Sequence, residues 1–145
     1  MFSHILVPVD GSDNSFAALD KAVALSQLTG AVLSILTVYR HHSLLEASLS
    51  MVRKSDPRPF DDVMREHATE VAELAKARAV AGGVGEVHAY VRNGAVARGI
   101  VNFARDRAVD LIVMGGRGAG SAENYMLGSI SHKVTSLTQG PVMVV

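Results

Sequence analysis

The chain contains no cysteine, which excludes a disulfide framework, a thiol nucleophile and a thiolate metal site. It also has no excess of charge of either sign, because 14 Lys and Arg residues balance 14 Asp and Glu residues. This balance removes the electrostatic reason to expect nucleic acid or an anionic membrane as a partner.

Long apolar runs are missing too, since none approaches the roughly 20 residues that a membrane-spanning helix needs. Residues 1–4 carry neither the basic nor the apolar segment of a secretory signal peptide, so we expect a cytoplasmic protein. At 145 residues, 48% of them hydrophobic and 19% charged, the chain is expected to form one domain over residues 1–145 with a true core.

Strand and helix patterns alternate along the chain. Apolar runs predict buried strands over 4–9, 31–38, 86–91, 110–115 and 141–145. Apolar residues at helical spacing predict helices over 13–29, 61–81, 95–108 and 127–138, with Leu28 and Leu137 on their inward faces. This order is typical of an open parallel sheet with helices on both faces. The stretch 40–60 has no assignable pattern, and its length favours a local helix or a functional flap.

The most informative stretch joins the fourth strand to the last helix. Met114-Gly-Gly-Arg-Gly-Ala-Gly-Ser121 leaves the strand, and Gly128-Ser129-Ile130-Ser131 opens the helix. Its backbone N–H groups suit an anion, because the first N–H groups of a helix lack intrahelical partners and lie at the positive end of its dipole. The stretch predicts a phosphate site. A flexible turn that serves close packing is the less favoured alternative.

A second loop, Asp10-Gly11-Ser12, follows the first strand. Ligands of open parallel sheets bind at the carboxyl ends of strands, where the winding direction reverses. If the first and fourth strands flank that point, Asp10 lies near the phosphates and acts through Mg²⁺. A helix-capping turn explains Asp10 and Ser12 equally well, so both roles stay open.

Other motifs of nucleotide chemistry and catalysis are absent. Gly115–Gly120 has the spacing of a Walker loop, but Ser121-Ala122 replaces the lysine and the hydroxyl residue. Neither Gly-x-Gly-x-x-Gly nor Gly-x-Ser-x-Gly occurs, and the six histidines have no metal-ligand spacing. Arg117 is the only cation between Met114 and Ser121, where phosphate contact and solvent exposure are almost equally expected.

The last strand is an apolar sheet edge that no Lys, bulge or following helix protects. Pairing with the same strand of a second copy would satisfy its backbone groups, so residues 141–145 favour a homodimer. The alternative is an edge covered by the 40–60 connector or by the terminus.

Together these segments resemble the universal stress protein family of the UspA type. The resemblance rests on Val7-Pro-Val-Asp-Gly-Ser12, on Asp110–Gly115 and on Gly-x-x-Gly-x₉-Gly-Ser from Gly115 to Ser129, with Ser131-x-x-Val134 and Pro141–Val145 in addition. It covers the whole chain, and the glycine spacing is that of the ATP-binding subgroup. It implies a Rossmann-like five-stranded parallel sheet of order 3-2-1-4-5 and a dimer through the last strand.

The resemblance also implies roles for particular residues. Asp10 would lie by the phosphates and any Mg²⁺, while Pro8, Val9 and Val38 would line an adenine pocket. Met114, Gly115, Arg117 and Gly118 would approach the ribose and the α-phosphate, and Gly128, Ser129, Ile130 and Ser131 would hold the β- and γ-phosphates. Gly116 departs from the family pattern, which usually has Ser, Thr or His there.

The function that the sequence favours is an ATP-binding stress-response module, a homodimer whose nucleotide (ATP, ADP or AMP) sets loop order and so the binding of a protein partner. Without a Walker lysine, a water-positioning base or a clear arginine finger, at most slow hydrolysis is expected. One alternative is a nucleotide-free dimeric interaction module. Another is an adenylyl-transfer or ATP-pyrophosphatase enzyme, for which the loop Asp10–Ser15 is too acidic.

Overall fold

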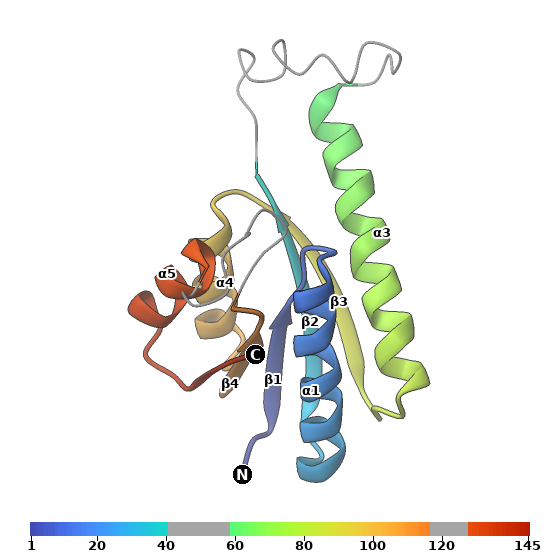
Figure 1. Cartoon of the computed structure of the whole chain (residues 1–145), viewed down its shortest axis with the longest axis vertical. Helices are drawn as coiled ribbons and strands as arrows, with labels where there is room; N and C mark the ends of the chain where they lie inside the picture. Colours follow the sequence, from blue (N-terminus) through green and yellow to red (C-terminus); the bar gives the residue numbers. More distant parts are fainter. Residues whose placement is uncertain (41–58, 117–127) are drawn as a thin grey trace.

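The computed structural model describes residues 1–40, 59–116 and 128–145. Five strands form one sheet in the order β3-β2-β1-β4-β5, and every neighbouring pair is parallel (Figure 1). The strands are β1 (His4–Pro8), β2 (Val32–Tyr39), β3 (Val87–Asn93), β4 (Leu111–Met114) and β5 (Val142–Val144). The predicted fold class and strand order are confirmed. The predicted connector 40–60 falls mostly outside the described residues.

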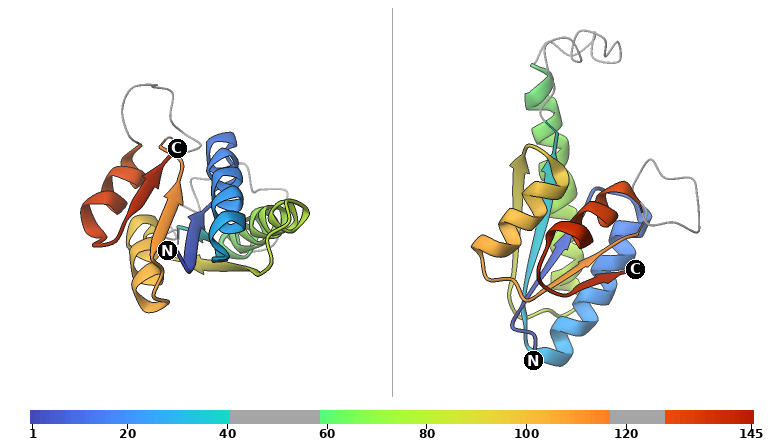
Figure 2. Two further views of the ribbon diagram at one scale, coloured as in Figure 1. Left: turned by 90° about the horizontal axis from the view of Figure 1, so that it is seen from below. Right: turned by 90° about the vertical axis from the view of Figure 1, so that its left-hand side faces the viewer.

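In the described residues, four helices lie between the strands: α1 (Asp13–Thr29), α3 (Phe60–Ala81), α4 (Val96–Asp106) and α5 (Ser129–Leu137). α1 and α3 cover one face of the sheet, and α4 and α5 cover the other (Figure 2, left). The strands alternate between these faces, so Val7 packs toward α1 and α3 while Leu6 packs toward α4 and α5. Both faces of the sheet are therefore buried, as a parallel sheet requires.

Two leucines predicted to face inward do not. Leu28 is 83% exposed and Leu137 is 43% exposed. The buried face of α1 runs through Ser15, Ala18, Leu19, Ala22, Val23 and Ser26, which leaves Leu28 on the far side of the last turn. Leu137 is the final residue of a nine-residue helix, and it lines an open cavity between α4 and α5.

A carboxylate fixes the start of the first strand against the fourth. Asp110 accepts hydrogen bonds from the backbone N–H of Ser3 (2.8 Å), the Ser3 hydroxyl (3.0 Å) and the backbone N–H of His4 (3.0 Å). Partial burial raises the pKa of Asp110, but these hydrogen bonds lower it more, so its pKa lies below the usual value. A lowered pKa means that the interaction stabilises the fold above the unfolded-state pKa of Asp110, and acid weakens it.

Among the described residues, no helix is both long enough and apolar enough to cross a membrane.

Candidate functional site

The winding of the sheet reverses between β1 and β4. These strands pair in parallel through Ile5 with Leu111 and Leu6 with Ile112, whereas β2 lies on the other side of β1. Their carboxyl ends therefore meet at one edge of the sheet, and the loops that begin at Val9 and Gly115 leave it side by side. Open α/β sheets bind ligands at this place.

The N-terminus of α5 lies at this edge and has no side-chain cap. Gly128 is the N-cap residue with φ −62° and ψ 158°, and no acidic residue lies in the first turn. The first intrahelical hydrogen bond runs from the backbone N–H of His132 to the carbonyl of Gly128 (2.9 Å). The N–H groups of residues 129–131 thus have no intrahelical acceptor, and they suit an anion.

Backbone and hydroxyl groups hold the two ends of the glycine-rich loop together. The carbonyl of Gly116 accepts from the N–H of Gly128, and the N–H of Gly116 donates to the carbonyl of Val145 (3.0 Å). The Ser131 side chain, in a residue only 2% exposed, donates to the carbonyls of Gly128 (3.0 Å) and Gly116 (3.4 Å). The hydroxyl of Ser131 thus stabilises the base of the loop. The backbone N–H of Ser131, not its hydroxyl, is the group that could bind an anion.

Gly115 has a packing role that the sequence did not reveal. A Cβ at this position would clash with Oδ1 of Asn14, lie 2.9 Å from its Cγ and lie 3.1 Å from its backbone carbonyl carbon. The side chain of Asn14 also donates to the carbonyl of Val145 (3.3 Å). Asn14 therefore joins the start of α1 to the ends of β4 and β5. No local pattern could predict this contact, because 100 residues separate the two positions.

The apolar residues assigned to the nucleotide site lie on two faces of the sheet. Val38, Met114 and Ile130 pack with the cluster under α4 and α5, and Pro8 is half-buried at the end of β1. Val9 instead lies in the cluster under α1 and α3, where it is 3% exposed. Only the backbone of Val9 remains at the strand edge, where its N–H donates to the carbonyl of Leu36 (2.9 Å).

Asp10 is exposed and one of its oxygens takes part in the turn that begins α1. Its Oδ1 accepts from the N–H of Ser12 (2.9 Å), and Ser12 caps the helix by accepting from the N–H of Ser15 (3.2 Å). The capping turn is therefore present. In residues 1–40, 59–116 and 128–145, no group of three or more His, Asp or Glu side chains could hold a metal ion. Arg117 and Gly118 lie outside the described residues.

The fold and this edge define an open α/β protein with an uncapped helix N-terminus at its switch point. A family model described as the universal stress protein family matches residues 1–145. The chain is 40% identical to "Universal stress protein YxiE" of Bacillus subtilis, over 100% of this chain and 99% of that protein. The chain therefore belongs to the universal stress protein family.

Solved structures share this fold. "Universal stress protein UspA from Lactobacillus plantarum" has a TM-score of 0.81 to this fold and 26% identity, covering 99% of this chain and 97% of that one. A universal stress protein in complex with cAMP has a TM-score of 0.75 and 24% identity, covering 99% and 97% of the two chains.

Proposed function

We propose that this protein binds ATP, or its diphosphate or monophosphate, at the carboxyl edge of β1 and β4. The observation that carries the proposal is the N-terminus of α5, where Gly128 supplies no capping side chain and no carboxylate competes in the first turn. A phosphate group would there accept from N–H groups at the positive end of the helix. The cAMP complex of a protein with this fold supports an adenine nucleotide as the ligand class.

The residues at this edge fit such a ligand. Gly128, Ser129, Ile130 and Ser131 would hold the β- and γ-phosphates. Val38 and Pro8, with the backbone of Val9, would lie against the adenine, and Met114 and Gly115, with Arg117 and Gly118 outside the described residues, would approach the ribose and the α-phosphate. Asp10 is the one carboxylate in this set, and Mg²⁺ commonly binds through one carboxylate together with substrate phosphates.

We further propose that the bound nucleotide regulates a cytoplasmic stress-response module and is hydrolysed slowly at most. Backbone amides position phosphates, but fast transfer also needs groups that orient the attacking water and stabilise the developing charge. The residues of the proposed site include no lysine and a single carboxylate. Occupancy would then act through Gly116 and Gly128, which a backbone hydrogen bond joins at this edge.

The proposal is tested on freshly purified protein by mass spectrometry of extracted nucleotide, followed by calorimetry of Mg²⁺-ATP on the emptied protein. We expect co-purified ATP or ADP and a dissociation constant in the micromolar range. Absence of both nucleotide and binding heat would instead favour the nucleotide-free interaction module.

We also propose that β5 forms a homodimer across a two-fold axis. The N–H of Val145 donates to Met114, and the carbonyl of Pro141 accepts from Ile112, so residues 141 and 145 pair with β4. In a parallel strand the backbone groups of alternate residues point to opposite neighbours. Val142 and Val144 therefore present their N–H and C=O groups to the side of β5 that faces away from β4, where a second copy can pair with them.

Val144→Pro should convert this dimer to a monomer. Proline removes the outward N–H at position 144 and leaves the N–H groups that pair with β4 in place. Sedimentation velocity at micromolar concentration measures the change, with Val144→Ala as the matched control that keeps the N–H. A Val144→Pro protein that remains as dimeric as Val144→Ala would rule out this edge as the interface.

A further inference from the structure

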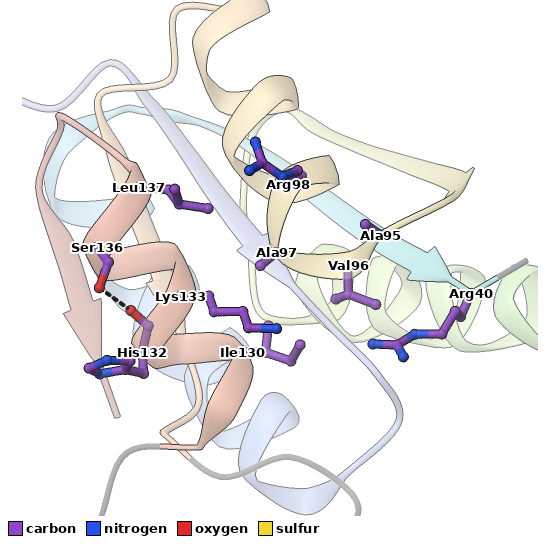
Figure 3. Close-up of a pocket in the computed structure, with 10 residues that line it drawn as sticks. All are labelled: Arg40, Ala95, Val96, Ala97, Arg98, Ile130, His132, Lys133, Ser136 and Leu137. Carbon is purple, nitrogen blue, oxygen red and sulfur yellow. Dashed lines mark hydrogen bonds between the residues drawn. The ribbon is translucent and has the colours of Figure 1, made fainter.

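A cavity of about 370 Å³ lies between α4 and α5, beside the end of β2 (Figure 3). Its apolar lining comes from Val96 and Ala97 of α4 and from Ile130 and Leu137 of α5. Three cationic residues, Arg40, Arg98 and Lys133, also line it, and the described residues around it include no carboxylate. A mostly apolar cavity of this size with a few charged groups is typical of sites for small organic molecules.

Two of the cations converge on this cavity. Figure 3 shows that Arg40, just after β2, and Lys133, on α5, extend toward each other past Val96 and Ile130, whereas Arg98 points away. Neither Arg40 nor Lys133 forms an ion pair with an acidic group in the part of the chain that the structure describes. Both residues are exposed, so solvent screens their mutual repulsion, and an anion between them would contact both positive charges at once.

We propose that this cavity binds a small organic anion with a flat apolar body and a single oxyanion group. The apolar body lies on Val96 and Ile130, and the oxyanion group lies between the guanidinium of Arg40 and the ammonium of Lys133. A planar guanidinium with paired N–H donors suits such a group. Ile130 is shared with the proposed nucleotide site, but neither cation belongs to that site.

The shared residue makes it necessary to separate this site from the nucleotide site. The probe is 1-anilinonaphthalene-8-sulfonate, an aromatic sulfonate, titrated by fluorescence in the presence of saturating Mg²⁺-ATP. We expect saturable binding that Lys133→Glu and Arg40→Glu each weaken by at least about tenfold, because each reverses a charge that contacts the sulfonate. Lys133→Arg should retain binding.

The matched control is Lys76→Glu, which reverses an exposed lysine on α3, on the opposite face of the sheet. It should leave the dye affinity unchanged, and thermal unfolding of every variant shows whether its fold is intact. Calorimetry of Mg²⁺-ATP on Lys133→Glu should give the wild-type affinity for ATP. The same measurement on the wild type tests the nucleotide proposal independently of dye binding. The proposal would be overturned if the wild-type protein did not bind the dye, or if both charge-reversal variants still bound it with wild-type affinity. It would also be overturned if Lys133→Glu lost dye binding and ATP binding together.

Discussion

Gly128→Asp should abolish nucleotide binding and leave the fold at least as stable as the wild type. Position 128 has the extended conformation of a helix N-cap, in which aspartate is among the preferred residues. Its carboxylate would accept from the N–H groups at the start of α5, stabilising the helix by a few tenths of a kcal/mol or more. The same carboxylate would occupy the phosphate position and repel the nucleotide, so we expect affinity for Mg²⁺-ATP to fall at least about a hundredfold.

Calorimetry and thermal unfolding measured on the same preparation separate these two effects. Gly128→Asn is the matched control, because asparagine caps the same N–H groups without a charge. We expect it to weaken binding less than Gly128→Asp and to melt at a similar temperature. If Gly128→Asp kept wild-type ATP affinity, the phosphates would not lie at the N-terminus of α5. The proposal of a nucleotide site at the edge of β1 and β4 would then lose its main support.

Local patterns were sufficient to predict the architecture of this protein. Each predicted strand and helix exists, and most boundaries differ from the predictions by one or two residues, because breakers such as Gly30 and Gly82 follow the periodic segments. Helix faces were less predictable near the ends. Leu28 fits a helical spacing, yet the buried face of α1 runs through Val23 and Ser26, and Leu28 on the far side of the last turn remains exposed.

The sequence predicted where the start of α5 lies in the fold, but not the contacts around it. The start of α5 lies at the switch point, as the order of the elements implies, and the anion site that the glycine spacing indicates stays a prediction. The burial of the Ser131 hydroxyl depends on the carbonyl of Gly116, 15 residues away, and the cavity under Arg40 depends on how α4 and α5 pack. Such contacts are set by tertiary structure, which residue spacing alone does not encode.

Gly115 shows why this distinction matters for interpreting a glycine motif. Its φ is not positive, in contrast to Gly11, Gly30, Gly83 and Gly94, so the backbone conformation does not require glycine there. What requires glycine is the close approach of Asn14. Gly115→Ala should therefore destabilise the protein by about 1–3 kcal/mol through overpacking, more than the roughly 0.4–1 kcal/mol that alanine gains by restricting the unfolded chain.

Equilibrium unfolding in urea measures this loss, and Asn14→Ala in the same background tests its cause. Removing the amide takes away the atoms nearest the new methyl group, although the hydrogen bond from Asn14 to Val145 is lost as well. The double variant should therefore lose about 1 kcal/mol less than the sum of the two single variants. If the two losses of stability were additive, the contact with the Asn14 side chain would not be the cause of the overpacking. A stable Gly115→Ala protein that no longer bound ATP would instead mean that this glycine serves the ligand and not the packing of α1 on β4.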